Sequence, residues 1–423
     1  MPVIDSIKRA VRTRLVARSG GMDLTQLDRV PENLTWPLNR VGMDPSPRLG
    51  RLREAAPVSK LVSFLGMDVW LVTGDAEARE LLSDMTTYST DIRPLMGKSG
   101  SADGDIGGLG FTDPPEHTRL RRLLTPEFTM RRLARLGPSI DDIIATQLAE
   151  TERAACGSGV PVDLVQTFAF PIPYLVICEL LGLPDEDRET FRTLGTARFD
   201  VTKGGVGTVG AIGGSRQFLL EAAARQRLEP GPGLIGQIIR EHGEEINDFD
   251  LGGLADGVFT GGLETSASML ALGTAVLLQD RELWQRLGAD ETVAVPVVED
   301  LLRYLSVVQV AFGRFAKKDV VVGGQHIKSG SVVLASLPAV NRDPRTTAGD
   351  RLDLDRANGS HLAFGYGFHR CVGAELARME LRAAFPALAR RFPEMRLAVP
   401  TDELKYRAKS IVYGLESLPV LLD

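Results

Sequence analysis

The feature that most constrains the fold is a long apolar run near the middle of the chain, LADGVFTGGLETSASMLALGTAVLLQ, at residues 254–279. The run is far longer than a strand, for which about four to eight residues is usual, so the pattern predicts a helix. Asp256 and Glu264 interrupt it, and the sequence contains no stretch of roughly eighteen apolar residues without a charge. The run therefore predicts a buried core helix, and no transmembrane span is expected.

Helical periodicity also dominates residues 75–288, whereas strand patterns are confined to short patches. VSKLVSFLGMDVWLVTG, residues 58–74, predicts a β-hairpin, residues 307–337 are rich in strand patterns, and the chain ends in further short strands. Because these segments do not alternate with helices, a doubly wound sheet is excluded. With 423 residues, 43% of them hydrophobic, the chain can fill one large core. We predict a mainly α fold with small β sheets, in which an N-terminal extension, residues 1–45, precedes a single large domain, residues 46–423.

Charge and cysteine content narrow the class of protein. The net charge is −6, so the composition does not indicate a nucleic-acid-binding protein. Residues 1–20 predict an amphipathic helix rich in arginine, which either makes a weak peripheral contact with an anionic membrane or packs on the body. The three cysteines, Cys156, Cys178 and Cys371, are far apart and odd in number, which excludes a complete disulfide framework and a CxxC motif. We therefore expect a cytoplasmic protein.

One glycine-rich segment has the spacing of a dinucleotide site but not its context. Gly205, Gly207 and Gly210 match GxGxxG, yet no apolar strand precedes them and no βαβ unit surrounds them. Residues 203–214 are therefore interpreted as a connection between helices.

Cys371 lies in the segment FGYGFHRCVG, directly before a helical pattern. Free N–H groups and the positive end of the helix dipole favour a thiolate there, which can act as a nucleophile or as a metal ligand. His369 is only two residues away and is poorly placed to serve as its base. Haem is a metal group that one protein donor can hold, because the porphyrin supplies the other four donors. The loop glycines allow its backbone to approach a flat ring: Gly365, Gly367 and Gly373.

A haem would need cations for its propionates and a helix face with room for the ring. In DPPEHTRLRR, His117 and Arg121 are four residues apart on one helical face, and Arg314 follows a strand pattern. In the long central helix, Gly257, Gly261 and Thr265 recur every four residues and form a face of small side chains. Both requirements are therefore met in the sequence.

Together these motifs resemble the cytochrome P450 family, the haem-thiolate monooxygenases, and in particular its soluble bacterial members. FGYGFHRCVG, GGLETS, DPPEHTRLR and RFA each match a family motif, and AVNRDP and GLESLPV follow the family pattern in the right order. The resemblance implies a cytochrome P450 fold, a single large helical domain around a buried haem b, iron protoporphyrin IX. It also implies that Cys371 is the axial ligand of the haem iron.

The resemblance further implies roles for individual residues. Glu264 and Thr265 would be the acid and alcohol that deliver protons during oxygen activation. The residues expected to bind the cofactor are His117, Arg121, Gly261, Arg314, Phe364, Gly365, His369, Cys371 and Gly373. The residues expected to line an apolar substrate pocket are Phe259, Val307, Val308, Val310, Ile411 and Val412.

Two positions depart from the expected pattern. The family has a Glu-x-x-Arg salt bridge, yet the residue three before Arg303 is Asp300, with Glu299 one further back. Either acid can reach Arg303 on a helix, and through it Arg356. Pro386 lies inside the helix after Cys371, where we expect it to kink or shorten that helix.

The implied function is insertion of one oxygen atom from O2 into a lipophilic small molecule such as a fatty acid, terpenoid, steroid or polyketide. Electrons would come from an external ferredoxin and its reductase, docked on a basic patch: Arg119, Arg122 and Arg370. A peroxide-driven relative is disfavoured by the acid and alcohol pair. A non-catalytic haem-thiolate ligand-binding or gas-sensing protein is the alternative, and a cysteine hydrolase would be active without haem.

Overall fold

The computed structural model describes residues 32–64, 67–91, 108–155, 157, 159–199, 205–347, 349–354 and 360–423. Several sequence predictions therefore lie outside the described residues: the basic helix of residues 1–20, Cys156 and Arg356. The division at residue 45 stays a prediction.

Helices make up most of the described chain. The longer α-helices are α3 (Pro47–Ala55), α4 (Asp75–Ser83), α6 (Glu116–Leu124), α8 (Gly137–Ala154), α9 (Pro171–Leu181), α10 (Asp185–Phe199), α11 (Gly205–Leu228), α12 (Leu234–His242), α13 (Asp248–Leu277), α14 (Arg281–Ala289), α15 (Ala294–Leu305) and α17 (Ala374–Arg391). The shorter helical segments are α2 (Glu32–Thr35), η2 (Trp36–Leu38), η4 (Gly108–Phe111), η5 (Thr125–Phe128), α7 (Met130–Leu133), η6 (Ala134–Leu136), η7 (Val165–Ala169), η9 (Glu291–Val293), α16 (Leu337–Asn341) and η10 (Gly367–His369).

The strands form small sheets, as the sequence predicts. The largest has the order β3-β4-β10-β7-β5, in which β4 and β10 are parallel and the other neighbours antiparallel. Its strands are β3 (Val58–Phe64), β4 (Met67–Val72), β5 (Tyr88–Ser89), β7 (Arg314–Ala316) and β10 (Val332–Ala335). The remaining strands form a sheet β11-β12-β6 and two hairpins: β11 (Arg396–Leu397), β12 (Pro419–Leu421), β6 (Val162–Asp163), β1 (Arg40–Val41), β2 (Asp44–Pro45), β8 (Val320–Val322) and β9 (Gln325–Ile327).

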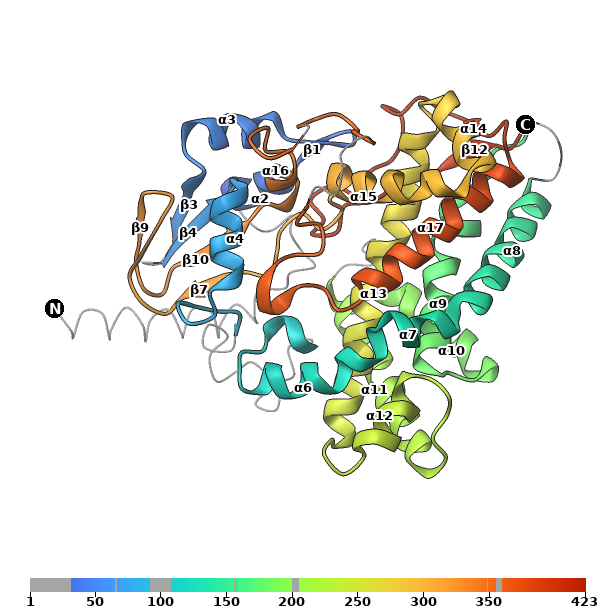
Figure 1. Ribbon diagram of the computed structural model, residues 1–423, viewed down its shortest axis with the longest axis horizontal. Coiled ribbons are helices and arrows are strands. Elements are labelled where there is room, and N and C mark those ends of the chain that lie inside the picture. The colour runs from blue at the N-terminus through green and yellow to red at the C-terminus, as the bar shows by residue number, and fades with distance from the viewer. Residues whose placement is uncertain are drawn as a thin grey trace.

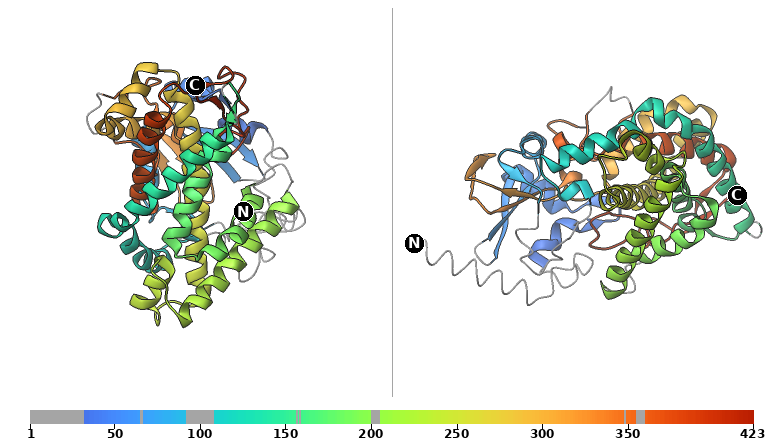
Figure 2. Two further views of the ribbon diagram at one scale, coloured as in Figure 1. Left: turned by 90° about the vertical axis from the view of Figure 1, so that its right-hand side faces the viewer. Right: turned by 90° about the horizontal axis from the view of Figure 1, so that it is seen from below.

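The sheet and the helices occupy opposite sides of the molecule. Figure 1 shows the five-stranded sheet, together with α3 and α4, at one end of the molecule and most of the helices at the other end, and the right-hand view of Figure 2 shows the same division. The predicted central helix is confirmed as α13, capped by Asn247, whose side chain accepts a hydrogen bond from the Asp250 N–H. It lies between α9, α11 and α17 and packs on each of them.

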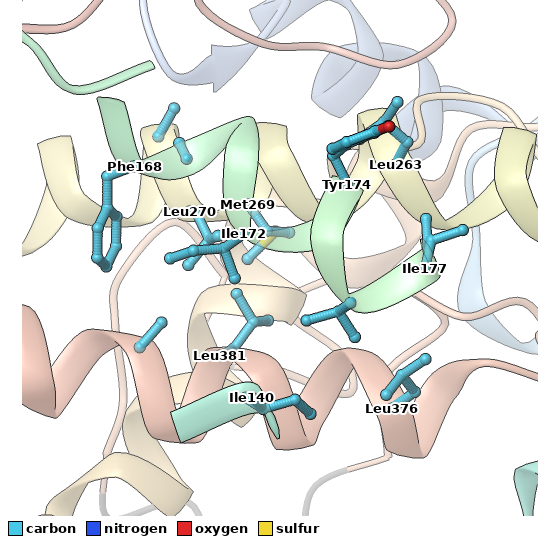
Figure 3. Packing of buried hydrophobic residues seen from close by; sticks show 14 of the residues in the cluster. Ile140, Phe168, Ile172, Tyr174, Ile177, Leu263, Met269, Leu270, Leu376 and Leu381 are labelled. Atoms are coloured by element: carbon cyan, nitrogen blue, oxygen red, sulfur yellow. The ribbon is translucent and has the colours of Figure 1, made fainter. Parts of the chain in front are cut away.

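The hydrophobic core surrounds α13. Figure 3 shows Leu263, Met269 and Leu270 of α13 packed with residues of α9 and α17, among them Ile172 and Leu381. Each such side chain, fully buried, contributes roughly 1.5–3 kcal/mol. This packing fixes the position of α13 relative to α17, the helix that follows Cys371. Because α13 is one continuous helix, its N-terminal part is held in the same way.

One local prediction is wrong, and the shortening of α17 expected at Pro386 is not observed. The glycine-rich segment expected as a connection is helical from Gly205 onwards, as the start of α11. Each helix glycine costs about 1 kcal/mol, but the later turns of α11 bury Leu219 and Ala223 against neighbouring helices, and tertiary packing outweighs propensity. Pro386 does not end α17, which continues to Arg391, because Pro386 is itself buried in the core beside Phe385.

In the part of the chain that the structure describes, no single helix is long and apolar enough to cross a membrane. Only α13 and α14 taken together pass by length and composition, and they are bent by 118° relative to each other.

Candidate active site

The loop before α17 holds Cys371 in a fixed backbone conformation. The Cys371 N–H donates to the carbonyl of Phe364 at 2.8 Å, which closes the loop. Gly365 and Gly367 both have a φ of 70°, in the left-handed region that favours glycine. A Cβ on Gly367 would lie 2.6 Å from the carbonyl oxygen of Leu82, so the loop packs directly on the end of α4.

Cys371 is an exposed residue, yet protein atoms surround its thiol closely. Burial raises the pKa of the thiol, opposed by the Gly373 N–H and by the cations of Arg121 and Arg370. Both facts hold if the sulfur faces an opening inside the protein rather than its outer surface. A ligand with its own positive charge in that opening would favour the thiolate.

Four basic side chains meet beside this loop. The rings of His117 and His369 lie 4.4 Å apart, centroid to centroid. Burial lowers the pKa of His369 to about 3, and Arg314, His117 and Arg121 lower it further by charge repulsion. Asp113 is the acid whose charge opposes this lowering of the His369 pKa, and it also accepts hydrogen bonds from the neighbouring edge of β5.

Several nitrogens of these basic groups are buried without a hydrogen-bond partner in the described part of the chain. His117 is 2% exposed, and neither of its ring nitrogens has a partner among the described residues. Arg314 is 1% exposed, its Nε has no partner in the same part of the chain, and burial lowers its pKa to about 10. Buried polar groups without hydrogen-bond partners are costly. The arrangement fits a ligand that carries carboxylates.

Across α13, the predicted small-residue face is open. Gly261 is exposed in the middle of the helix, and a Cβ built there would meet nothing within 4 Å. The Thr265 hydroxyl donates to the Gly261 carbonyl at 2.7 Å. Glu264 pairs with Arg407, Oε1 to Nη1 at 2.7 Å, and burial raises the Glu264 pKa although Arg407 opposes the shift.

Most of the predicted pocket residues come together on two segments. Val308 and Val412 form an isolated antiparallel bridge, and the N–H of Tyr413 donates to the Val307 carbonyl at 2.7 Å. Ile411 accepts from the Gln309 N–H at 2.9 Å. These contacts join the segment after α15 to the C-terminal loop.

The two remaining predicted pocket residues have other neighbours. Val310 forms an isolated bridge with Ser336. Phe259 is fully buried and packs on the ring of Phe191 at 4.4 Å, away from the bridge between the two segments.

Arg303 lies where the sequence departs from the family pattern, and its salt bridge uses the acid that is nearer to it in sequence. Asp300 binds the Arg303 guanidinium through both carboxylate oxygens, at 2.5 and 3.0 Å, and both side chains are buried. Glu299 instead binds Arg378 and Arg382 on α17. The alternatives that the sequence left open are therefore resolved in favour of Asp300.

Comparisons with known proteins agree on one family. The cytochrome P450 family model matches residues 292–405. Cytochrome P450 165B3 of Amycolatopsis orientalis is 38% identical over 393 residues, covering 90% of this chain and 97% of the relative. The chain belongs to the cytochrome P450 family. This P450 is an oxidoreductase, and the cofactor of its family is protoporphyrin IX haem.

Solved structures agree with this assignment. The Orf6* (CYP165D3) monooxygenase involved in teicoplanin biosynthesis has a TM-score of 0.82 at 35% identity, covering 91% of this chain and 99% of that one. OxyC, implicated in an oxidative C–C coupling reaction during vancomycin biosynthesis, has a TM-score of 0.81 at 38% identity, covering 91% and 95%. The predicted P450 fold is thereby confirmed.

The residues of this P450 fit a haem. An exposed cysteine, a cluster of basic groups with unpartnered nitrogens on His117 and Arg314, and an open helix face are features that suit such a group. Sequence reasoning missed two charged members of the site. Asp113 stands at the start of a motif already singled out, whereas Arg407 has no local signal, since its partner Glu264 is 143 positions away.

Proposed function

We propose that this P450 is a haem-thiolate monooxygenase that inserts one oxygen atom from O2 into a lipophilic small molecule. The observation that carries the proposal is the exposed residue Cys371 beside a cluster of basic groups in which His117 and Arg314 have buried nitrogens without a hydrogen-bond partner in the described chain. When bound, the haem supplies oxygen activation, and its thiolate ligand favours O–O cleavage by donating electron density.

In this proposal the basic cluster holds the haem propionates. His117 and Arg314 have free polar nitrogens, and Arg121 already donates through Nη2 to the carbonyl of Arg370, which precedes Cys371. His369 lies against His117 and can donate from either ring nitrogen. Two carboxylates would relieve the charge repulsion within the cluster, since each propionate adds an anion to the one that Asp113 provides beside His369.

Glu264 and Thr265 are proposed to move protons. A hydroxyl has one hydrogen to donate and two lone pairs to accept with. Thr265 donates to Gly261, so its oxygen remains available to accept a proton or a water hydrogen bond. Glu264 is the adjacent acid, and burial raises its pKa, which brings proton release closer to neutral pH.

The substrate is proposed to be a lipophilic secondary metabolite. The Val307 and Val308 segment joined to Ile411 and Val412 presents aliphatic side chains, which favour an apolar ligand. Relatives include proteins named for teicoplanin and vancomycin biosynthesis and a nocardicin C N-oxygenase. A further solved relative, StaH, is named for the biosynthesis of a glycopeptide antibiotic, which adds compounds of that class to the fatty acids, terpenoids, steroids and polyketides as candidates.

The first experiment is spectroscopic. We expect the purified, haem-loaded protein to show a red-shifted thiolate-type Soret band in its reduced carbon monoxide complex, and Cys371→Ser to lose it. Lipophilic compounds titrated into the ferric protein should shift the resting spectrum where they bind. Folded protein without haem, or a histidine-type carbonyl spectrum, would contradict the proposal. Haem binding without turnover under a competent redox chain would favour the ligand-binding or gas-sensing alternative.

A second candidate reaction is oxidative coupling, the kind of reaction in which the structural relative OxyC is implicated. The two reactions differ in the product. Oxygen insertion gives a product with one more oxygen atom than the substrate, whereas coupling removes two hydrogen atoms and adds no oxygen. Mass spectrometry of turnover under labelled O2 therefore distinguishes them.

Electrons are proposed to come from an external ferredoxin and its reductase. The patch expected around Arg119 and Arg122 is weakened, because these residues pair with Asp250 and Glu245. Arg370 is exposed beside the cysteine loop, and Phe368 on that loop is 52% exposed, which suits a docking surface with apolar and basic groups.

Charge reversal tests this surface. We expect Arg370→Glu to slow reduction by an acidic ferredoxin several-fold at low salt, with the difference from the wild type shrinking at high salt. Chemical reduction by dithionite should be unchanged. Arg51→Glu, an exposed charge on α3, is the matched control. Equal rates for both variants would place the ferredoxin elsewhere.

We also propose that the protein is cytoplasmic, because its few cysteines do not form a disulfide framework.

A further inference from the structure

The C-terminal segment of residues 405–416, called the C-terminal hairpin from here on, links the substrate pocket to the proposed acid. Its two arms are joined by main-chain hydrogen bonds, from the Arg407 N–H to the Gly414 carbonyl at 2.9 Å and from the Glu416 N–H to the Lys405 carbonyl at 2.8 Å. A bridge between Tyr406 and Leu415 lies between them. The position of the Arg407 backbone is therefore fixed.

The C-terminal hairpin packs closely on α13. A Cβ on Gly414 would lie 2.6 Å from the Ser268 hydroxyl and 3.6 Å from the guanidinium carbon of Arg407. Ser268 is one helical turn after Glu264, so both residues share one face of α13. The contact therefore brings the Arg407 side chain to the face that carries the acid.

Arg407 forms an ion pair with the Glu264 carboxylate. Their ion pair is 2.7 Å long, and the two side chains are only 19% and 18% exposed. In the part of the chain that the structure describes, Arg407 is the charged group that acts on Glu264, and it opposes the effect of burial on the pKa of this carboxyl. Water screens a pair of this kind less than one on the open surface.

The tip of the C-terminal hairpin carries residues of the proposed pocket wall. The side-chain amide of Gln309 donates to the Ser410 carbonyl at 2.8 Å, and the backbone N–H of Gln309 donates to the Ile411 carbonyl at 2.9 Å. Ile411 and its neighbour Val412 are residues proposed to line the substrate pocket. The same hairpin thus holds the pocket wall at its tip and the acid through Arg407.

We propose that Arg407 is a positioning residue that holds the Glu264 carboxylate on the hairpin side of α13 and so determines where this acid can deliver its proton. The inference rests on the proposed function, because it concerns the proton delivery assigned to Glu264. It adds a residue outside α13 to that step.

The first test measures coupling in the haem-loaded enzyme, as hydrogen peroxide released per NADPH oxidised. It uses a compound that shifts the ferric spectrum as substrate. Arg407→Gln should raise peroxide release several-fold, Arg407→Lys should restore most of the wild-type value, and Arg407→Gln should add nothing to Glu264→Gln. Lys405→Gln, which removes an exposed cation from the same arm, is the control. Additive effects, or an unchanged ratio in Arg407→Gln, would overturn the proposal.

The second test needs no turnover. Infrared difference spectra across a pH titration should show the protonated carboxyl band of Glu264, assigned by its loss in Glu264→Gln. Removing the opposing cation should raise the pKa of Glu264, so the band should persist to higher pH in Arg407→Gln, by about one pH unit or more. Lys405→Gln should leave the band unchanged. A band that titrates at the same pH in Arg407→Gln as in the wild type would refute the role of Arg407.

Further controls separate the possible failures. Hydrogen exchange should show the C-terminal hairpin amides still protected in Arg407→Gln, because the backbone of residue 407 and not its side chain donates to Gly414. Loss of that protection would assign Arg407 a structural role instead. Absence of the thiolate spectrum in the wild type would refute the proposed function, whereas a normal spectrum with an unaffected Glu264 would refute only this inference.

Discussion

Glu380→Gln should stabilise the folded protein at neutral and alkaline pH. Glu380 lies on α17 and is 2% exposed, and its Oε2 has no hydrogen-bond partner in the described chain. Burial raises its pKa from 4.5 to about 8, and a hydrogen bond with Ser266 on α13 opposes the shift. The carboxyl is therefore neutral in the folded protein at pH 7, whereas it is ionised in the unfolded chain.

The size of the effect follows from proton binding. Between pH 4.5 and about pH 8 the folded protein keeps a proton on Glu380 that the unfolded chain has released. The free energy of unfolding then falls by about 1.4 kcal/mol for each pH unit of increase, and the cost at pH 7 is on the order of 3 kcal/mol. The contribution is complete below pH 4.5 and lost as the pH rises to about 8. Glutamine has nearly the same shape and no proton to release.

Urea unfolding of the haem-loaded protein measures this difference. We expect wild type and Glu380→Gln to have similar stability near pH 5, and the variant to be more stable by a growing margin towards pH 8. Glu375→Gln changes a less buried carboxylate on the same helix, which pairs with Arg378, and serves as the control. A stability difference between wild type and Glu380→Gln that does not change with pH would show that Glu380 is not a buried neutral acid.

Three further substitutions test other features. Gly273→Ala should cost about 1–3 kcal/mol in urea unfolding, because its Cβ would lie 2.5 Å from the Phe385 ring; an unchanged midpoint would mean that α13 and α17 can separate freely. Asp300→Ala leaves the Arg303 charge buried without its carboxylate and should cost about 3–5 kcal/mol in the same assay; a loss below about 1 kcal/mol would contradict the importance of this pair. Thr265→Ala should keep the carbon monoxide spectrum but release more peroxide per NADPH; equal product per electron would argue against a proton relay through this hydroxyl.

The sequence predicts the fold class and the parts of the site that lie in short motifs. Cys371, His369 and the loop glycines are neighbours in sequence, so their spacing carries the geometry of the loop. His117 and Arg121 likewise share one helical turn. Their role as cofactor ligands came from the family resemblance.

The sequence alone does not show which residues that are distant along the chain pair with each other. The ion pair between Glu264 and Arg407 joins α13 to a loop that no local pattern relates to it. The choice of Asp300 rather than Glu299 depends on where α17 places Arg378 and Arg382. The helical start of α11 was missed for the same reason, since local glycine content opposes a helix that tertiary packing stabilises.

The contact between the cysteine loop and α4 has a consequence for the order of assembly. Because Gly367 packs on the carbonyl of Leu82, the loop that carries Cys371 reaches its final shape only when the early and late parts of the chain have met. The same is true of the sheet, in which β4 and β10 are parallel neighbours. Such distant contacts form slowly, since long loops must close first. During synthesis, capture of the prosthetic group therefore belongs to the end of folding, after the last helix has been made.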